Sequence, residues 1–358
     1  MSFDNANTEN FAGLVERWKC INDDTIFDRD SAVDWLEDAL HAAIKLEFST
    51  IPPYLCALWS IKDQSDPIAR SIRSVVQEEM LHMALACNML VAIGGTPKIA
   101  DPAFAPVYPG KLAGGVHDSL VVRLTHLSDA ALEDFLLIER PERDMANETQ
   151  ALKDAVHLPE ADENDSTIGK FYDLLVTAFD KVQPEFETER QISGPLAWFP
   201  VRNLDEVRKA VDLIKHQGEG STSDPSEAED GELAHFYRFL EILNRRKIEK
   251  QQDGRWGFGA EIPAVEVYPM AEVPPHGFDE DRMPAHARQL VDAFDGQYAK
   301  LLAQLGDLWA RGEQGQLVGA IETMFSLQGP ARELMQIEIA GQAGQTYGPC
   351  FRIKEITA

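Results

Sequence analysis

The chain has 358 residues, of which 44% are apolar, so it can bury a substantial core. Its 33 basic and 60 acidic residues give a net charge of −27, which argues against nucleic acid and membrane surfaces as partners. The segment 1–11 does not resemble a signal peptide, and the longest apolar stretch, 81–93, is too short to span a bilayer. The four scattered cysteines lack CxxC spacing, so we expect a reducing, cytoplasmic setting.

A first long helix is expected from Asp30 or Ser31, either of which can cap its N-terminus. Steps of three and four residues place apolar side chains and one carboxylate on a single face: Leu36, Leu40, Ala43, Ile44 and Glu47. Pro52 and Pro53 follow about one turn later. Because proline cannot donate the helical hydrogen bond, a kink is expected there.

A second helix is expected after Pro67, running to about Ile93, where Gly94 and Gly95 stop it. Its inward stripe also follows steps of three and four: Ile68, Ile72, Val75, Glu79, His82, Ala86, Met89 and Ile93. Two polar residues therefore stand in the centre of an apolar face.

The stretch 95–202 has a mixed pattern, with a candidate strand at 119–124 and candidate helices at 129–139 and 167–182. We interpret it as a long insertion or crossover, because a bundle whose second and third helices run parallel needs such a connection.

A third helix is expected over 204–217, capped by Asn203. Glu219 follows it between two glycines and lies off its apolar face. It is either re-aimed toward the core by a bulge or helix end, or exposed to solvent. A fourth helix, 232–250, follows an acidic loop, and its stripe reads Glu232, His235, Phe239 and Ile242. Two more helices are expected at 285–310 and 317–340.

The expected architecture is a mainly α single domain, 1–358, built around a four-helix bundle. Residues 31–94 supply bundle helices 1 and 2, 95–202 form the insertion, and 203–250 supply helices 3 and 4. Residues 251–358 form an irregular segment and extra C-terminal helices.

Two Glu-x-x-His motifs, Glu79 to His82 and Glu232 to His235, carry the chemistry. Residues three apart on a helix face the same way, so each motif can present a carboxylate and an imidazole to one point in the core. This mixture suits a pair of redox-active metal ions. In di-iron bundles the other two helices add a lone glutamate each. The predicted ligands are therefore Glu47, Glu79, His82, Glu219, Glu232 and His235.

A buried polar network is the competing interpretation. Glu47, Glu79 and Glu232 fall on stripes expected to face a core, and breaking a buried pair costs about 3–5 kcal/mol, so a cation must compensate them. Arg73 or Arg238 could supply that charge in place of a metal.

Several segments together resemble the ferritin-like iminophenyl-pyruvate dimer synthase family: LEFSTIPPYLCALWSI, EEMLHMALACNMLVAIGG, HQGEG and ELAHFYRFLEI. Enzymes of this family, known from bisindole pigment biosynthesis, couple two imine molecules derived from an oxidised aromatic amino acid. The resemblance covers about 32–250, with a fainter match at GPCF. It implies a ferritin-like fold and supports all six ligand roles, that of Glu219 included. In the pigment enzymes this domain belongs to a much longer chain, so imine coupling does not transfer directly.

The resulting functional hypothesis is a non-haem di-metal oxidoreductase whose partners are a small organic substrate, for example an amino-acid-derived imine, and O₂ or peroxide. Two iron ions are the expected cofactors, and manganese or a mixed pair stays open. Candidate pocket walls are Trp198, Phe199, Trp256 and Phe258, although ordinary packing also explains each of them. The alternatives are an iron-handling ferroxidase or peroxide-scavenging protein and a non-catalytic ferritin-like protein. A homo-oligomer is left open.

Overall fold

The computed structural model describes residues 11–23, 27–141, 147–156, 167–194, 198–220, 225–226 and 232–353. They form a mainly helical protein with extra helices at the C-terminal end, which confirms the expected fold class. None of the described helices is long and apolar enough to cross a membrane.

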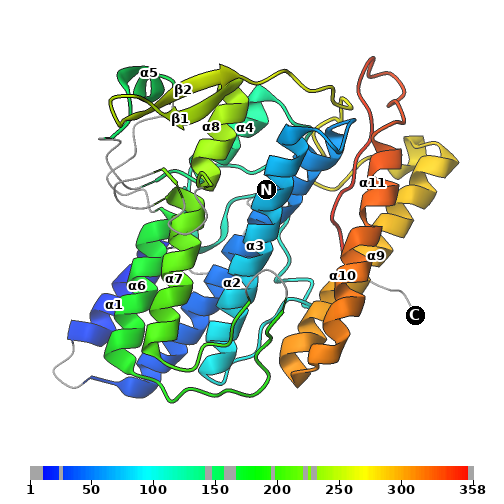
Figure 1. Cartoon of the computed structure of the whole chain (residues 1–358). Coiled ribbons are helices and arrows are strands. Elements are labelled where there is room, and N and C mark those ends of the chain that lie inside the picture. The colour runs from blue at the N-terminus through cyan, green and yellow to red at the C-terminus, as the bar shows by residue number, and fades with distance from the viewer. Residues whose placement is uncertain are drawn as a thin grey trace.

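Two long helices form the centre of the molecule: α2 (Arg29–Ser60) and α3 (Pro67–Ala92) (Figure 1). The side chain of Asp28 accepts hydrogen bonds from the first turn of α2, and Asp66 does the same for α3. Gly94, in the left-handed region at φ 91°, follows the end of α3. The short helix α1 (Phe11–Asp23) packs against α2.

The other half of the bundle consists of two interrupted helices. On one side are α4 (Asp129–Ile138) and α6 (Ile168–Val182), and on the other are α7 (Leu204–Glu219) and α8 (His235–Asn244). The helix α6 packs against α2 and α7, while α4 packs against α8 (Figure 1). Part of the stretch 95–202 thus lies in the bundle itself. Both interruptions fall near mid-bundle, and this places helix ends inside the core.

The predicted fourth helix is shorter than expected. It begins at His235 and stops at Asn244, because Arg245 adopts a left-handed conformation at φ 53°. An antiparallel hairpin follows, made of β1 (Arg246–Lys250) and β2 (Trp256–Glu261), with α5 (Gln150–Asp154) beside β2. The candidate strand 119–124 is reduced to one isolated bridge between Gly110 and Val122. The one-turn helix η1 (Ala113–Gly115) packs on α2.

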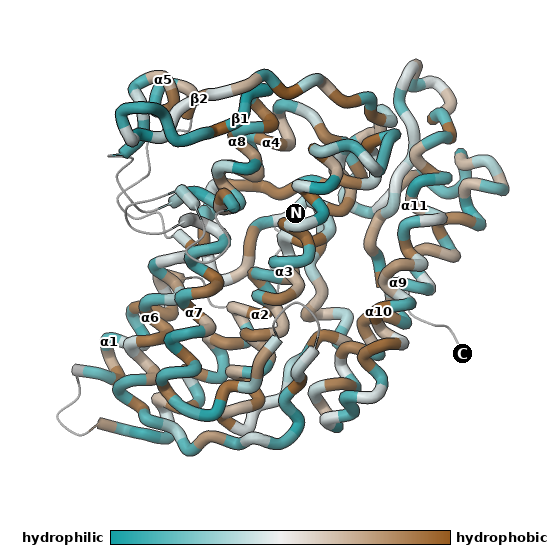
Figure 2. Tube along the Cα trace, in the orientation of Figure 1, coloured by the Kyte–Doolittle hydropathy of each residue, from teal (hydrophilic) through white to brown (hydrophobic). Residues whose placement is uncertain are grey.

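The C-terminal helices form a further layer beside α2 and α3 (Figure 1). They are α9 (Ala285–Arg311), α10 (Leu317–Ser326) and α11 (Gln328–Leu334), with short turns η2 (Glu280–Arg282) and η3 (Gln314–Gln316). The helix expected over 317–340 is therefore two shorter ones. Figure 2 shows apolar residues along α2, α3 and α10. Contacts between the layers join α11 to α2 and α9 to α3.

Candidate metal centre

Five buried acidic and imidazole side chains meet in the middle of the bundle. Glu47 comes from α2, Glu79 and His82 from α3, Glu139 from the residue after α4, and His235 from the first residue of α8. Each is at most 3% exposed. The two helix interruptions bring Glu139 and His235 to the same level as the ligands on the long helices.

Glu79 is shared between two overlapping groups of ligand atoms. Its Oε1 lies 3.6 Å from Nδ1 of His82 and 2.9 Å from Nδ1 of His235. Glu47 completes the first group, with its Oε2 3.6 Å from His82 Nδ1. Glu139 completes the second, with its Oε2 3.5 Å from His235 Nδ1. Within each group the ligand atoms lie within 4.8 Å of one another, which is compatible with one ion in each.

Each carboxylate is held through its other oxygen by a hydroxyl group. The three hydrogen bonds, each 2.6 Å long, run from Tyr172 Oη to Glu47 Oε1, from Thr50 Oγ1 to Glu79 Oε2, and from Tyr54 Oη to Glu139 Oε1. These donors fix the orientation of the carboxylates and leave one oxygen of each facing the centre.

Both imidazoles are held through Nε2. His82 Nε2 lies 2.8 Å from Gln217 Oε1, and His235 Nε2 lies 2.8 Å from Glu78 Oε2. Arg238 in turn donates to Glu78 at 3.0 Å. Because Nε2 of each imidazole ring is directed to one of these acceptors, the opposite ring nitrogen, Nδ1, faces the carboxylates. Nδ1 of His235 is buried and, although it lies 2.9 Å from Glu79 Oε1, it makes no hydrogen bond. A nitrogen that ligates a metal ion is expected to lack a hydrogen bond in the same way.

The charges at the centre also favour cations. Burial, aided by the charge of Glu79, raises the pKa of both Glu47 and Glu139. Burial alone would lower the pKa of His82, but Glu47 and Glu79 raise it to about 10. The carboxylates thus draw positive charge inward, as protons or as metal ions, and metal ligation would displace such protons.

The structure brings together four of the six ligands predicted from the sequence: Glu47, Glu79, His82 and His235. It does not bring Glu232 to them: this side chain is 61% exposed and lies 3.2 Å from Arg238. The reason is that α8 begins only at His235, so Glu232 is not on the same helical face. Glu219 ends α7, and the position of its side chain falls outside the described residues.

Glu139 is the residue that sequence reasoning missed. It was included only as the last residue of a predicted helix, 129–139. The available signal was its place directly after an apolar helical run, FLLI, but that signal does not separate a buried carboxylate from an exposed helix end.

The arginines of the competing network interpretation have other partners. Arg73 donates to the backbone and side-chain oxygens of Gln64. Arg238 bonds to Glu78, which supports His235 from outside the ligand groups.

Comparison with known proteins agrees with this geometry. A family model described as ferritin-like matches residues 40–244, more than half of the chain. The chain belongs to the ferritin-like family. This confirms the resemblance inferred from the sequence.

Two individual relatives extend the comparison. Dichlorochromopyrrolate synthase of Lentzea aerocolonigenes is 25% identical over 323 residues, which cover 80% of this ferritin-like chain but 30% of the synthase. The crystal structure of a ferritin-like protein from Caulobacter vibrioides superposes with a TM-score of 0.62 at 23% identity, covering 88% of this chain and 97% of that one. The structural match supports the fold.

Proposed function

We propose that this ferritin-like protein is a non-haem di-metal oxidoreductase that binds two iron ions and uses O₂ or peroxide to oxidise a small organic substrate, such as an imine derived from an amino acid. The observation that carries the proposal is the pair of buried imidazole Nδ1 atoms that face the shared Oε1 of Glu79. Glu47 would complete one ion site and Glu139 the other.

Iron bound by this mixture of carboxylate and imidazole ligands would supply redox chemistry toward oxygen. The residues of the chain hold that site rigid and dry. Tyr172, Thr50 and Tyr54 fix the carboxylates, and the burial of every ligand excludes bulk water. Glu78 keeps the outer nitrogen of His235 occupied. Burial would raise the pKa of Glu78, but His235 and Arg238 lower it to about 2, so it remains an anionic acceptor.

The comparisons support a small organic substrate without identifying it. The relative from L. aerocolonigenes is a dichlorochromopyrrolate synthase, and the present chain spans about a third of its length. The imine therefore remains a proposal. A reducing, cytoplasmic setting is part of it, supported by the four cysteines, all of which are free.

The test is metal content by elemental analysis, together with O₂ consumption on addition of imines generated from aromatic amino acids. Wild type is compared with Glu79→Ala and with the control His216→Ala, which changes a histidine of α7 outside the ligand groups. We expect about two metal ions per chain in wild type and control, as in di-iron bundles, and loss of metal and of O₂ consumption in Glu79→Ala.

Two results would contradict the proposal. If wild type holds no metal after anaerobic loading with ferrous iron, the buried residues form a polar network and the protein is non-catalytic. If metal is bound but O₂ and peroxide are consumed only with ferrous iron as the reductant, the protein handles iron. Manganese in place of iron would correct the cofactor only.

A further inference from the structure

The last turn of α7 lies directly against the metal centre. Gln217 Oε1 is 2.8 Å from His82 Nε2, and the next residue, Gly218, is buried beside the carboxylate of Glu139. His82 belongs to the first ligand group and Glu139 to the second. Two successive residues at the end of α7 therefore each adjoin one of the two groups.

The backbone conformation does not explain why position 218 is a glycine. Gly218 lies inside α7 and its φ is outside the left-handed region, whereas Gly220, which follows the helix, has a φ of 86° that favours glycine. Within a helix, glycine is less stable than alanine because its backbone loses more conformational freedom. A glycine at such a position usually has a packing reason.

The space around Gly218 supplies that reason. A methyl group added to Gly218 would lie 3.3 Å from Glu139 Oε2, closer than ordinary van der Waals contact. This oxygen is the one that lies 3.5 Å from His235 Nδ1 and faces the second ligand group. Within the described part of the chain, and apart from α7 itself, no other atom is within 4 Å of the added methyl group. A side chain at position 218 would therefore displace either this carboxylate or the end of α7.

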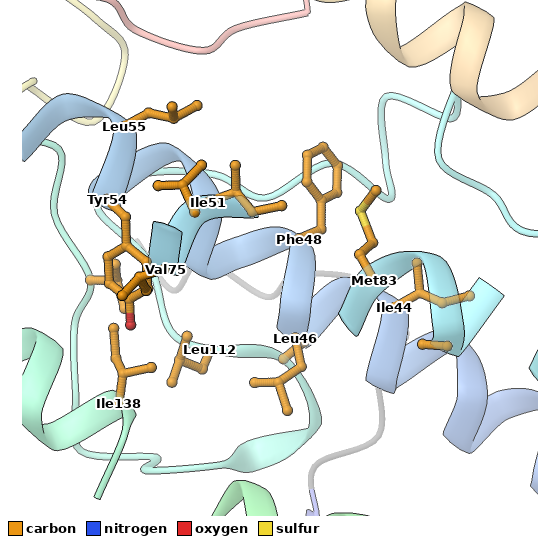
Figure 3. Packing of buried hydrophobic residues seen from close by; sticks show 14 of the residues in the cluster. Ile44, Leu46, Phe48, Ile51, Tyr54, Leu55, Val75, Met83, Leu112 and Ile138 are labelled. Atoms are coloured by element: carbon orange, nitrogen blue, oxygen red, sulfur yellow. The ribbon is translucent and has the colours of Figure 1, made fainter. Parts of the chain in front are cut away.

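The carboxylate is the part that would move. The helix α7 has 16 residues and packs against α3, α6 and α8, so its displacement would disturb three interfaces. The backbone before Glu139 is also fixed, because Ile138 is fully buried. Figure 3 shows Ile138 on the side of α2 to which the ring of Tyr54 points. Rotation of the Glu139 side chain would relieve the contact, but it would turn Oε2 away from His235 and weaken the hydrogen bond from Tyr54.

We propose that Gly218 is a positioning residue whose lack of a side chain keeps Glu139 Oε2 directed at the ion position beside His235. This inference rests on the proposed function, since it assigns a role within the same di-metal site. Ligand side chains have to be held to within about 0.5 Å of their productive geometry, so a small displacement of Oε2 is enough to weaken one ion site. The site formed by Glu47, Glu79 and His82 should not depend on Gly218.

Titration of the full chain with Co²⁺, followed by visible absorption, tests this proposal, because the absorption of Co²⁺ depends on its ligand geometry. Gly218→Ala is compared with wild type and with Gly296→Ala. Gly296 is a glycine of α9 at which an added methyl group has no atom within 4 Å, so it is the matched control. In Gly218→Ala we expect one equivalent to bind as in wild type, and the other to bind about tenfold more weakly with an altered spectrum. Gly296→Ala should bind both equivalents as wild type does.

Two further variants separate positioning from general damage to the fold. Glu139→Gln removes the carboxylate through which Gly218 acts, so adding Gly218→Ala to it should weaken the remaining ion no further. A general structural defect would add to the effect of Glu139→Gln. Gln217→Ala removes the acceptor at His82, so it should change the equivalent that Gly218→Ala leaves intact.

Three results would overturn the role of Gly218 and leave the di-metal site in place. They are wild-type binding of both equivalents by Gly218→Ala, an equal effect of Gly218→Ala with and without Glu139→Gln, and a Gly218→Ala spectrum that matches that of Gln217→Ala. The last would mean that α7 withdraws while Glu139 stays. If wild type itself binds neither Co²⁺ nor ferrous iron, the proposed function fails, and the role of Gly218 fails with it.

Discussion

Glu139 and Glu232 occupy opposite environments although both lie close to His235 in space or in sequence. Glu139 is 3% exposed, accepts a hydrogen bond from Tyr54 and has an oxygen 3.5 Å from His235 Nδ1. Glu232 is 61% exposed and pairs with Arg238. The exposed carboxylate of Glu232 is solvated by water, whereas the buried carboxylate of Glu139 must be compensated by a cation.

We therefore predict that Glu139→Gln and Glu232→Gln differ sharply in metal binding. Glu139→Gln removes the charge that faces His235, so the metal content should fall from about two ions per chain toward one. Glu232→Gln, the matched control, should retain the wild-type content. Elemental analysis of both variants after identical anaerobic loading measures the difference. Equal loss in both, or loss in Glu232→Gln alone, would return the ligand role to the second Glu-x-x-His motif.

The residues on the long helices were the ones that the sequence could predict. Glu47, Glu79 and His82 lie on unbroken stretches, where steps of three and four residues report directly on burial. His235 was assigned through a spacing that assumed a continuous helix from Glu232. The expected buried position is observed for His235, which begins α8, and is not observed for Glu232, because no helix extends back to it. The ligand role of His235 stays a prediction. Glu139 depends on tertiary packing against α8, which sequence spacing does not encode.

At the level of elements, α2 tolerates two prolines inside a helix of 32 residues. Proline at 53 removes the helical hydrogen bond to the carbonyl of Ser49. The hydroxyl of Tyr108, from the segment that follows α3, donates to that carbonyl at 2.7 Å. The prolines were visible in the sequence, but Tyr108, which lies 59 positions after Ser49 and replaces the bond lost at Pro53, was not. The repair matters because Glu47 and Thr50 lie on the adjoining turn.

We predict that Tyr108→Phe lowers the free energy of unfolding by about 1–3 kcal/mol, since it leaves the buried carbonyl of Ser49 without a donor. Tyr108 is 7% exposed, so water does not readily replace the hydroxyl. Chemical denaturation of wild type and variant gives the value. Tyr268→Phe, which keeps the ring that Lys62 and Arg332 face and removes only the hydroxyl, serves as the control and should change stability by less. Equal stability of Tyr108→Phe and wild type would mean that the prolines need no compensation.

The interruptions of the two other bundle helices limited the prediction most. Local periodicity gave α6, α7 and α9 nearly at their observed bounds, because each is an amphipathic run with a clear end signal. Thr167 and Asn203 cap the N-termini of α6 and α7, and Gly312 ends α9 in a left-handed conformation. The same periodicity made the predicted fourth helix, 232–250, too long at both ends. At its C-terminal end, the stretch 246–250 can continue a helical pattern but pairs with β2 instead. Strand pairing is set by a partner elsewhere in the chain, and local propensity is a weak guide to it.

On the scale of the whole molecule, one buried amide joins three parts of the chain. Asn88 of α3 is fully buried and accepts hydrogen bonds from the backbone N–H of Ile192 at 3.0 Å and from Trp309 Nε1 of α9 at 2.9 Å. It donates to the backbone carbonyls of Ile192 and Phe199 at 2.8 and 2.9 Å. The bundle, the segment before α7 and the C-terminal layer thus meet at this side chain, which in sequence is only a polar residue within an apolar run.

We predict that Asn88→Ala lowers the free energy of unfolding by about 3 kcal/mol, because it leaves several buried partners unsatisfied at once. The C-terminal layer should open before the bundle does, since Trp309 loses its polar anchor to α3 while the contacts between α2 and α3 are unaffected. Hydrogen exchange should therefore accelerate in α9 and α10 more than in α2. Asn244→Ala, which removes a partly buried amide bonded to Leu240 within α8, is the control and should leave α9 protected. Uniform acceleration across all helices would show instead that the layers unfold as a single cooperative unit and that Asn88 stabilises the molecule without holding the C-terminal layer in particular.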